Sequence, residues 1–118
     1  MEKGKKMRTQ KTLDNIAEAV LTTIGSDEPN FYDVLLKDGY RLSILTGSHY
    51  DSSKLKTVEV ALMDQKGFAF DGHSDNSIIN YLKFEIFLDF ITDVETWQNG
   101  CYVVKNIKDI FKEYQNNY

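Results

Sequence analysis

Hydrophobic side chains between Phe84 and Trp97 recur with the period of an α-helix and predict the element around which the chain is organised. On a helical wheel they cover an arc of about 200°, formed by Phe84, Ile86, Phe87, Leu88, Phe90, Ile91, Val94 and Trp97. An apolar arc of this width predicts a helix that packs against a sheet. The polar arc carries Glu85, Asp89 and Asp93, spaced i, i+4 and i+8 without an interleaved cation. These carboxylates repel one another and cost helix stability.

Two further helical patterns flank this element. The first has apolar positions at Leu13, Ile16, Ala17, Val20, Leu21 and Ile24. It predicts a helix over residues 12–24, with Thr12 as N-cap and Gly25 just beyond its end. The second is a stripe of Ile107, Ile110, Phe111 and Tyr114. It predicts a C-terminal helix that Asn106 caps.

Four short runs with strand character lie between the first two helices, at residues 31–36, 40–46, 57–64 and 68–70. Asp38-Gly39 joins the first two as a type I′ hairpin turn, which needs positive φ at both central positions. Gln65-Lys66-Gly67 joins the last two. Residues 101–104 are either a fifth strand or a buried connector. The sequence therefore predicts an α+β fold, with a four-stranded antiparallel meander sheet packed by the N-terminal helix, the central helix at about 84–97 and the C-terminal helix.

The charge is distributed unevenly along the chain. Its 118 residues predict one domain. Residues 1–11 hold five basic residues and one acidic residue, and we expect them to form a basic flexible tail ahead of a single domain at residues 12–118. The remainder holds nine basic and 17 acidic residues, a net charge of −8. An acidic body argues against direct duplex DNA binding, because phosphate contacts need a basic face.

Several classes of protein are excluded by what the sequence lacks. A single cysteine, Cys101, rules out an internal disulfide and is typical of a reducing compartment. No run approaches the ~18 apolar residues of a membrane span, and the N-terminus lacks the apolar stretch of a signal peptide. We therefore expect a soluble cytoplasmic protein without a membrane partner. No Gly-rich phosphate loop and no Gly-x-Ser-x-Gly elbow is present, so the sequence predicts no cofactor and no catalytic residue.

Both histidines lie in polar loops that contain carboxylates. His49 is near Asp51, and His73 is near Asp75. In an antiparallel meander the two loops fall at the same end of the sheet, where these four side chains would form a two-histidine, carboxylate metal site. A small metal-dependent enzyme is therefore the alternative function. The competing interpretation is a pair of exposed loops whose Asp and Ser side chains hold the backbone, since the spacing matches no metal motif.

The order of motifs between residues 38 and 97 resembles a group of small proteins. The matching segments are Gly39-Tyr40, Leu42-Ser43-Ile44, Thr57-Val-Glu-Val-Ala-Leu62, Asp75-Asn-Ser-Ile-Ile-Asn-Tyr-Leu82, Phe84-Glu85 and Val94-Glu95. In this order they resemble small uncharacterised accessory proteins of bacteriophages and mobile elements. The motifs are structural, so the resemblance implies an origin in a phage or plasmid, acting in a bacterial host cell, and no functional residue.

Carboxylates dominate the segment that contains the central helix. Residues 57–100 hold eight acidic residues against Lys66 and Lys83. A charged helix face is usually a solvated surface, but an unneutralised one attracts basic partners and speeds their association. The favoured function is a non-catalytic protein-binding factor that uses Glu85, Asp89 and Asp93 to bind a basic host protein. An inhibitor of host defence, such as an anti-CRISPR protein, is its most specific form.

Aromatic residues gather toward the C-terminus, at Trp97, Tyr102, Tyr114 and Tyr118. Aromatic side chains are enriched at the centres of interfaces, so this cluster is compatible with a homodimer. The competing interpretation is that Trp97 and Tyr114 complete the core of the monomer.

Overall fold

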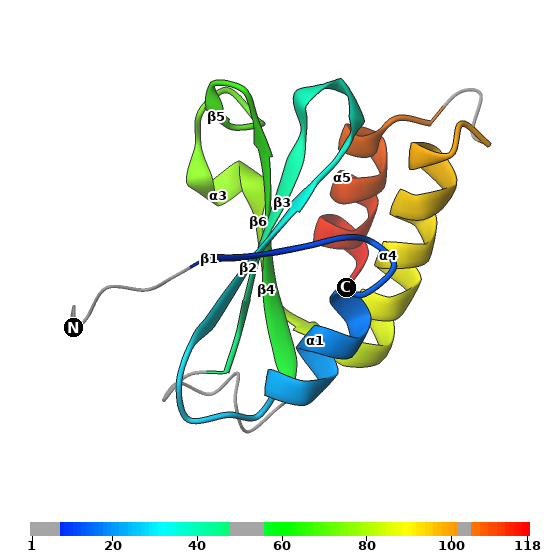
Figure 1. Cartoon of the computed structure of the whole chain (residues 1–118). Helices are drawn as coiled ribbons and strands as arrows, with labels where there is room; N and C mark the ends of the chain where they lie inside the picture. The colour runs from blue at the N-terminus through cyan, green and yellow to red at the C-terminus, as the bar shows by residue number, and fades with distance from the viewer. Residues whose placement is uncertain (1–7, 48–55, 102–104) are drawn as a thin grey trace.

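The described residues form a twisted six-stranded sheet, and helices pack on one of its faces (Figure 1). The computed structural model describes residues 8–47, 56–101 and 105–118. The strands are β1 (Arg8–Lys11), β2 (Asn30–Leu35), β3 (Arg41–Thr46), β4 (Thr57–Asp64), β5 (Gly67–Phe68) and β6 (Ile78–Lys83). The helices are α1 (Ile16–Thr23), the single turn α3 (Ser74–Ser77), α4 (Phe84–Gln98) and α5 (Ile107–Asn117), with a 3₁₀ turn η1 at Lys37–Gly39.

The predicted α+β class is confirmed and the four predicted strands pair in antiparallel order, but the sheet is mixed and six-stranded, so the prediction of an antiparallel meander alone is wrong. Its strand order is β1-β2-β3-β4-β5, and β6 also pairs with β4. The β1 strand runs parallel to β2, because the chain crosses over through α1 before it returns to the sheet. Residues 8–11, which the sequence places in a tail, form this edge strand. Arg8 holds it in place by donating to Asp33 Oδ1 at 2.9 Å and to Ser43 Oγ at 2.7 Å.

The far edge of β4 also differs from the prediction. The return strand expected over residues 68–70 pairs only through Gly67 and Phe68, at the Met63 end of β4. The rest of this edge pairs with β6, a strand that the sequence analysis did not predict. Apolar and polar residues do not alternate regularly along β6, because its pairing with β4 shifts in register between Val58 and Val60. In addition, Tyr81 adopts a left-handed backbone with φ of 57°.

Local turn and cap chemistry is as the sequence indicates. Asp38 and Gly39 have φ values of 62° and 80°, which confirms the predicted hairpin turn between β2 and β3. Asn106 caps α5 as predicted, and its side chain accepts from the backbone N–H of Asp109 in a reciprocal capping box. The first helix begins at Ile16, four residues later than expected, because Thr12 and the residues after it form a turn that leads out of β1.

The core lies between the sheet and its three helices. Its largest fully buried side chains are Phe87, Phe90, Phe111, Ile16, Leu42, Ile44, Leu62, Leu82, Ile107 and Ile110. Trp97 and Tyr114 are buried with them, which supports their predicted place in the monomer core, whereas Tyr118 is exposed. Cys101 is exposed, and residues 102–104 of the predicted strand or connector lie outside the described residues. No helix among the described residues is long and apolar enough to cross a membrane.

Candidate partner-binding surface

Helix α4 occupies the outer layer of the molecule, between α1 and α5, and its buried stripe sets which residues face outward (Figure 1). Phe87, Phe90, Ile91, Val94 and Trp97 face the core. Gly100, with φ of 77°, ends the helix in a Schellman motif, in which its N–H bonds to Trp97 and the N–H of Cys101 bonds to Thr96. With the core stripe and the helix end both fixed, the polar side of α4 is held in a defined orientation.

The outward side of α4 carries Glu85, Leu88, Asp89 and Thr92, all of which are exposed. No lysine or arginine occurs between Phe84 and Gln98. Two ion pairs form among the described residues, Arg8–Asp33 and Lys105–Glu113, so neither neutralises Glu85 or Asp89. We call these two carboxylates, together with the exposed Leu88 and Thr92, the outer face of α4. It presents negative charge directly to solvent.

Asp93, the third carboxylate of the predicted row, lies differently. It is half-buried and accepts a hydrogen bond of 2.6 Å from the Tyr114 hydroxyl on α5. Burial raises the pKa of Tyr114, and the hydrogen bond and charge of Asp93 and the charge of Asp89 raise it further. Asp93 therefore joins α4 to α5, while Glu85 and Asp89 remain available to a partner.

Replacing Tyr114 with phenylalanine should lower the free energy of unfolding by about 1–2 kcal/mol, because it removes a hydrogen bond to a carboxylate and leaves the ring packing intact. Urea denaturation measures this change. Phenylalanine at Tyr118, whose exposed ring stacks on Tyr114, is the matched control and should change stability by less than about 0.5 kcal/mol. Equal effects of the two substitutions would contradict a structural role for the Asp93 bond.

The same bond predicts how stability depends on alkaline pH. The pKa of Tyr114 is raised in the folded state, so its contribution is fully present below the ordinary tyrosine pKa of about 10 and is lost as pH rises above it. Between pH 8 and pH 11 the melting temperature of the wild type should therefore fall more steeply than that of Tyr114→Phe. Parallel curves for the two proteins would show that this hydroxyl does not contribute.

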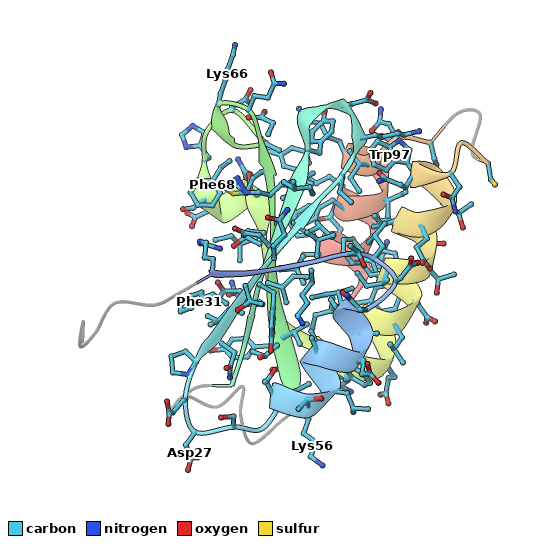
Figure 2. All side chains as sticks on the ribbon, in the orientation of Figure 1. Asp27, Phe31, Lys56, Lys66, Phe68 and Trp97 are labelled. Atoms are coloured by element: carbon cyan, nitrogen blue, oxygen red, sulfur yellow. The ribbon has the colours of Figure 1, made fainter. Side chains whose placement is uncertain are left out.

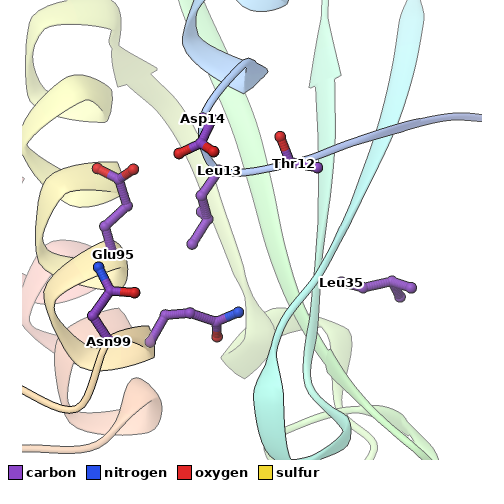
Figure 3. Close-up of a pocket in the computed structure, with 7 residues that line it drawn as sticks. Thr12, Leu13, Asp14, Leu35, Glu95 and Asn99 are labelled. Atoms are coloured by element: carbon purple, nitrogen blue, oxygen red, sulfur yellow. The ribbon is translucent and has the colours of Figure 1, made fainter.

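A cleft of about 270 Å³ lies beside the C-terminal end of α4. It is lined by Thr12, Leu13, Asp14, Leu35, Glu95, Gln98 and Asn99. Figure 3 shows the Glu95 side chain extending from the last turns of α4 toward the segment that carries Asp14. No basic residue is among the lining residues, and the last carbonyls of a helix add partial negative charge. The lining of this cleft therefore holds two carboxylates and no basic side chain.

The β2–β3 hairpin contacts the C-terminal end of α4 beside this cleft. The backbone N–H of Lys37 donates to Gln98 Oε1 at 2.9 Å, and the Lys37 ammonium lies 4.7 Å from the centre of the Trp97 ring. The placement of Asp14 and Glu95 in one cleft was not predicted. These residues are 81 positions apart, and they meet only because α1 and α4 pack on the same face of the sheet. No local sequence pattern carries that information.

The predicted metal site gains no support from the described part of the chain. His73 and Asp75 are exposed, and His49 and Asp51 lie outside the described residues. No group of three or more His, Cys, Asp or Glu side chains that could hold a metal ion forms among the residues described. The prediction placed the two histidine loops at the same end of the sheet. However, β3 ends at Thr46, near the start of β4, whereas β5 ends at Phe68, opposite Met63 near the end of β4. The strands that precede the two loops therefore end at opposite ends of β4.

Comparison of this chain with protein-family models, with curated proteins and with solved structures finds no match. The resemblance to phage and mobile-element proteins therefore stays a prediction.

Proposed function

We propose that this protein is a non-catalytic binding factor that uses the outer face of α4 to bind a basic surface of another protein. The observation that supports it is the exposure of Glu85 and Asp89 on a helix without lysine or arginine, in neither of the two described ion pairs. Like charges one helical turn apart destabilise a helix by a few tenths of a kcal/mol. A selected binding role explains why such a pair is kept.

The charge of the surface indicates the class of partner. An unneutralised acidic face attracts basic protein surfaces and speeds their association, and it repels acidic surfaces. Basic surfaces of bacterial proteins include channels that bind nucleic acid, which a small acidic protein could occlude. With the phage-like motif order, this favours an accessory factor of a phage or mobile element that acts on a host protein in the cytoplasm. An anti-CRISPR inhibitor is the form to test first.

Affinity capture from a bacterial lysate tests this proposal. The full chain, immobilised through a C-terminal tag, should retain a protein with a basic surface at low salt and release it as the salt concentration rises. Electrostatic attraction is screened over about 10 Å at 0.1 M salt and over about 3 Å at 1 M. Failure to retain any protein at low salt would contradict the proposal, and so would a partner whose retention does not depend on salt.

A further inference from the structure

The face of the sheet opposite the helices carries a second surface, separate from α4. Helices α1, α4 and α5 all lie on the other face, and Figure 2 shows Phe31 and Phe68 on the side away from them. Apolar side chains dominate this open face, namely Phe31, Leu35, Leu45, Met63, Phe68 and Ile78. All of them except Leu35 line a shallow hollow of about 140 Å³. Leu35 is exposed and the other five are partly buried, and an apolar sheet face that no described helix covers is a candidate interaction surface.

Two opposite charges on this face have no ion-pair partner among the described residues. The Nε of Arg41 is buried without a hydrogen-bond partner. Glu59 is half-buried among apolar side chains, and this burial raises its pKa. In the strand register Arg41 pairs with Met63, and Glu59 pairs with Leu45. The Cα atoms of the two residues are therefore about 14 Å apart, and neither residue is in a described ion pair.

A twofold axis between two copies of the chain can bring these two charges together. Ser43 and Ala61, two small residues that face each other across β3 and β4, lie midway between Arg41 and Glu59. When two such sheets stack face to face, a twofold axis can run between them over this Ser43–Ala61 pair. That axis brings Arg41 of each copy opposite Glu59 of the other. The Arg8 side chain also reaches Ser43 Oγ, so the guanidinium of each copy lies beside this axis.

We propose that two copies of this chain form a symmetric dimer through their open sheet faces, with Arg41 of each copy paired to Glu59 of the other. A second copy fits this face better than an unrelated partner, because a twofold interface must be complementary to itself and this face is. Near the axis the Arg8 groups of the two copies approach each other, and each is neutralised by Asp33 of its own chain. The dimer goes beyond the proposed function and leaves both α4 outer faces free.

The area of the face sets the strength of the contact. Five strand positions about 4.8 Å apart and six residues of about 3.3 Å each give a footprint of about 480 Å² per copy, or about 1,000 Å² in total. This lies at the lower end of specific interfaces. We therefore expect dissociation in the micromolar range, with dimer and monomer both populated at accessible concentrations.

Sedimentation velocity of the full chain, from low micromolar to near-millimolar concentration, tests the proposal. The wild type should shift from monomer to dimer across this range. Glu59→Arg alone and Arg41→Glu alone should each weaken the dimer by more than tenfold, because each places two pairs of like charges in contact. An equimolar mixture of these two variants should dimerise again, since the mixed dimer restores both opposite-charge pairs. Asp27→Arg and Lys66→Glu, exposed charge reversals outside the strands, should dimerise as the wild type does.

Three results would overturn the proposal. The first is a wild type that stays monomeric at the highest concentration. The second is a dimer whose stability does not change in Glu59→Arg, which would place the contact elsewhere. The Glu59→Arg measurement decides the question even if Arg41→Glu does not fold. The third is a mixture of two folded variants that remains monomeric. Because α4 lies on the other face, none of these results bears on partner capture.

Discussion

Replacing Phe90 with alanine should lower the free energy of unfolding by about 3–5 kcal/mol, the largest effect of any substitution considered in this protein. Phe90 is fully buried on the inner side of α4. Its ring meets Phe111 edge to face at 6.3 Å and Tyr114 at 5.3 Å. Truncation removes these aromatic contacts and leaves a cavity between α4 and α5. Since domains of this size are stable by about 5–15 kcal/mol, the loss is a large share of the total.

Urea denaturation followed by circular dichroism measures this change. Leu88→Ala is the matched control, because Leu88 lies on the same helix and is 39% exposed. It should change stability by less than about 1 kcal/mol. Similar losses for the two variants would contradict the assignment of α4 faces, and with it the orientation of the acidic residues.

Reversing the charge of Asp89 should have opposite effects on stability and on binding. Asp89→Lys converts its repulsive contacts with Glu85 and Asp93 at i−4 and i+4 into attractive ones, each worth a few tenths of a kcal/mol. The melting temperature should therefore stay the same or rise slightly. Binding to a basic partner should weaken by about a hundredfold, or roughly 3 kcal/mol, because the variant places like charges across a complementary interface.

Two alternative results for Asp89→Lys are informative. A loss of stability above about 1 kcal/mol would show that Asp89 is engaged within the fold, contrary to its exposed position. Unchanged affinity together with the expected stability would show that the outer face is only a solvated surface. Either result removes the basis of the proposed function.

Local signals in the sequence predict the elements that depend on them. The β2–β3 turn follows from Asp38-Gly39, and the start of α5 follows from the cap at Asn106, because both are decided by a few neighbouring residues. The wide apolar arc likewise predicts α4. Such features need no knowledge of the tertiary structure.

The two missed strands depend on distant partners. The Arg-Thr-Gln-Lys segment of β1 is polar throughout, and it becomes a strand because β2 offers an edge and Arg8 reaches Asp33 and Ser43. The alternation of β6 is hidden by its irregular pairing with β4. The antiparallel pairing of β2, β3 and β4 does not predict that the edge strand β1 runs parallel to β2. Pairings of this kind are properties of the folded chain.

The candidate surface was predictable in part for the same reason. Helical spacing places Glu85 and Asp89 on one exposed side, as the structure shows. It cannot reveal that Asp93 turns toward Tyr114, since the packing of α5 decides that contact. The Asp14–Glu95 cleft and the open sheet face likewise arise from tertiary packing. The sequence indicates the charge of the surface, and the fold determines which charges are accessible.

The most direct test of the proposed function is the affinity of the captured partner for three forms of the protein, measured by biolayer interferometry at low salt. These forms are the wild type, the double variant Glu85→Lys/Asp89→Lys, and a control with two reversed acidic residues away from α4, Asp27→Lys/Glu18→Lys. Both variants change the net charge equally. We predict that the double variant loses binding by at least a hundredfold while the control stays within about tenfold of the wild type. Wild-type affinity of the double variant, or equal losses in both variants, would contradict recognition through the outer face of α4.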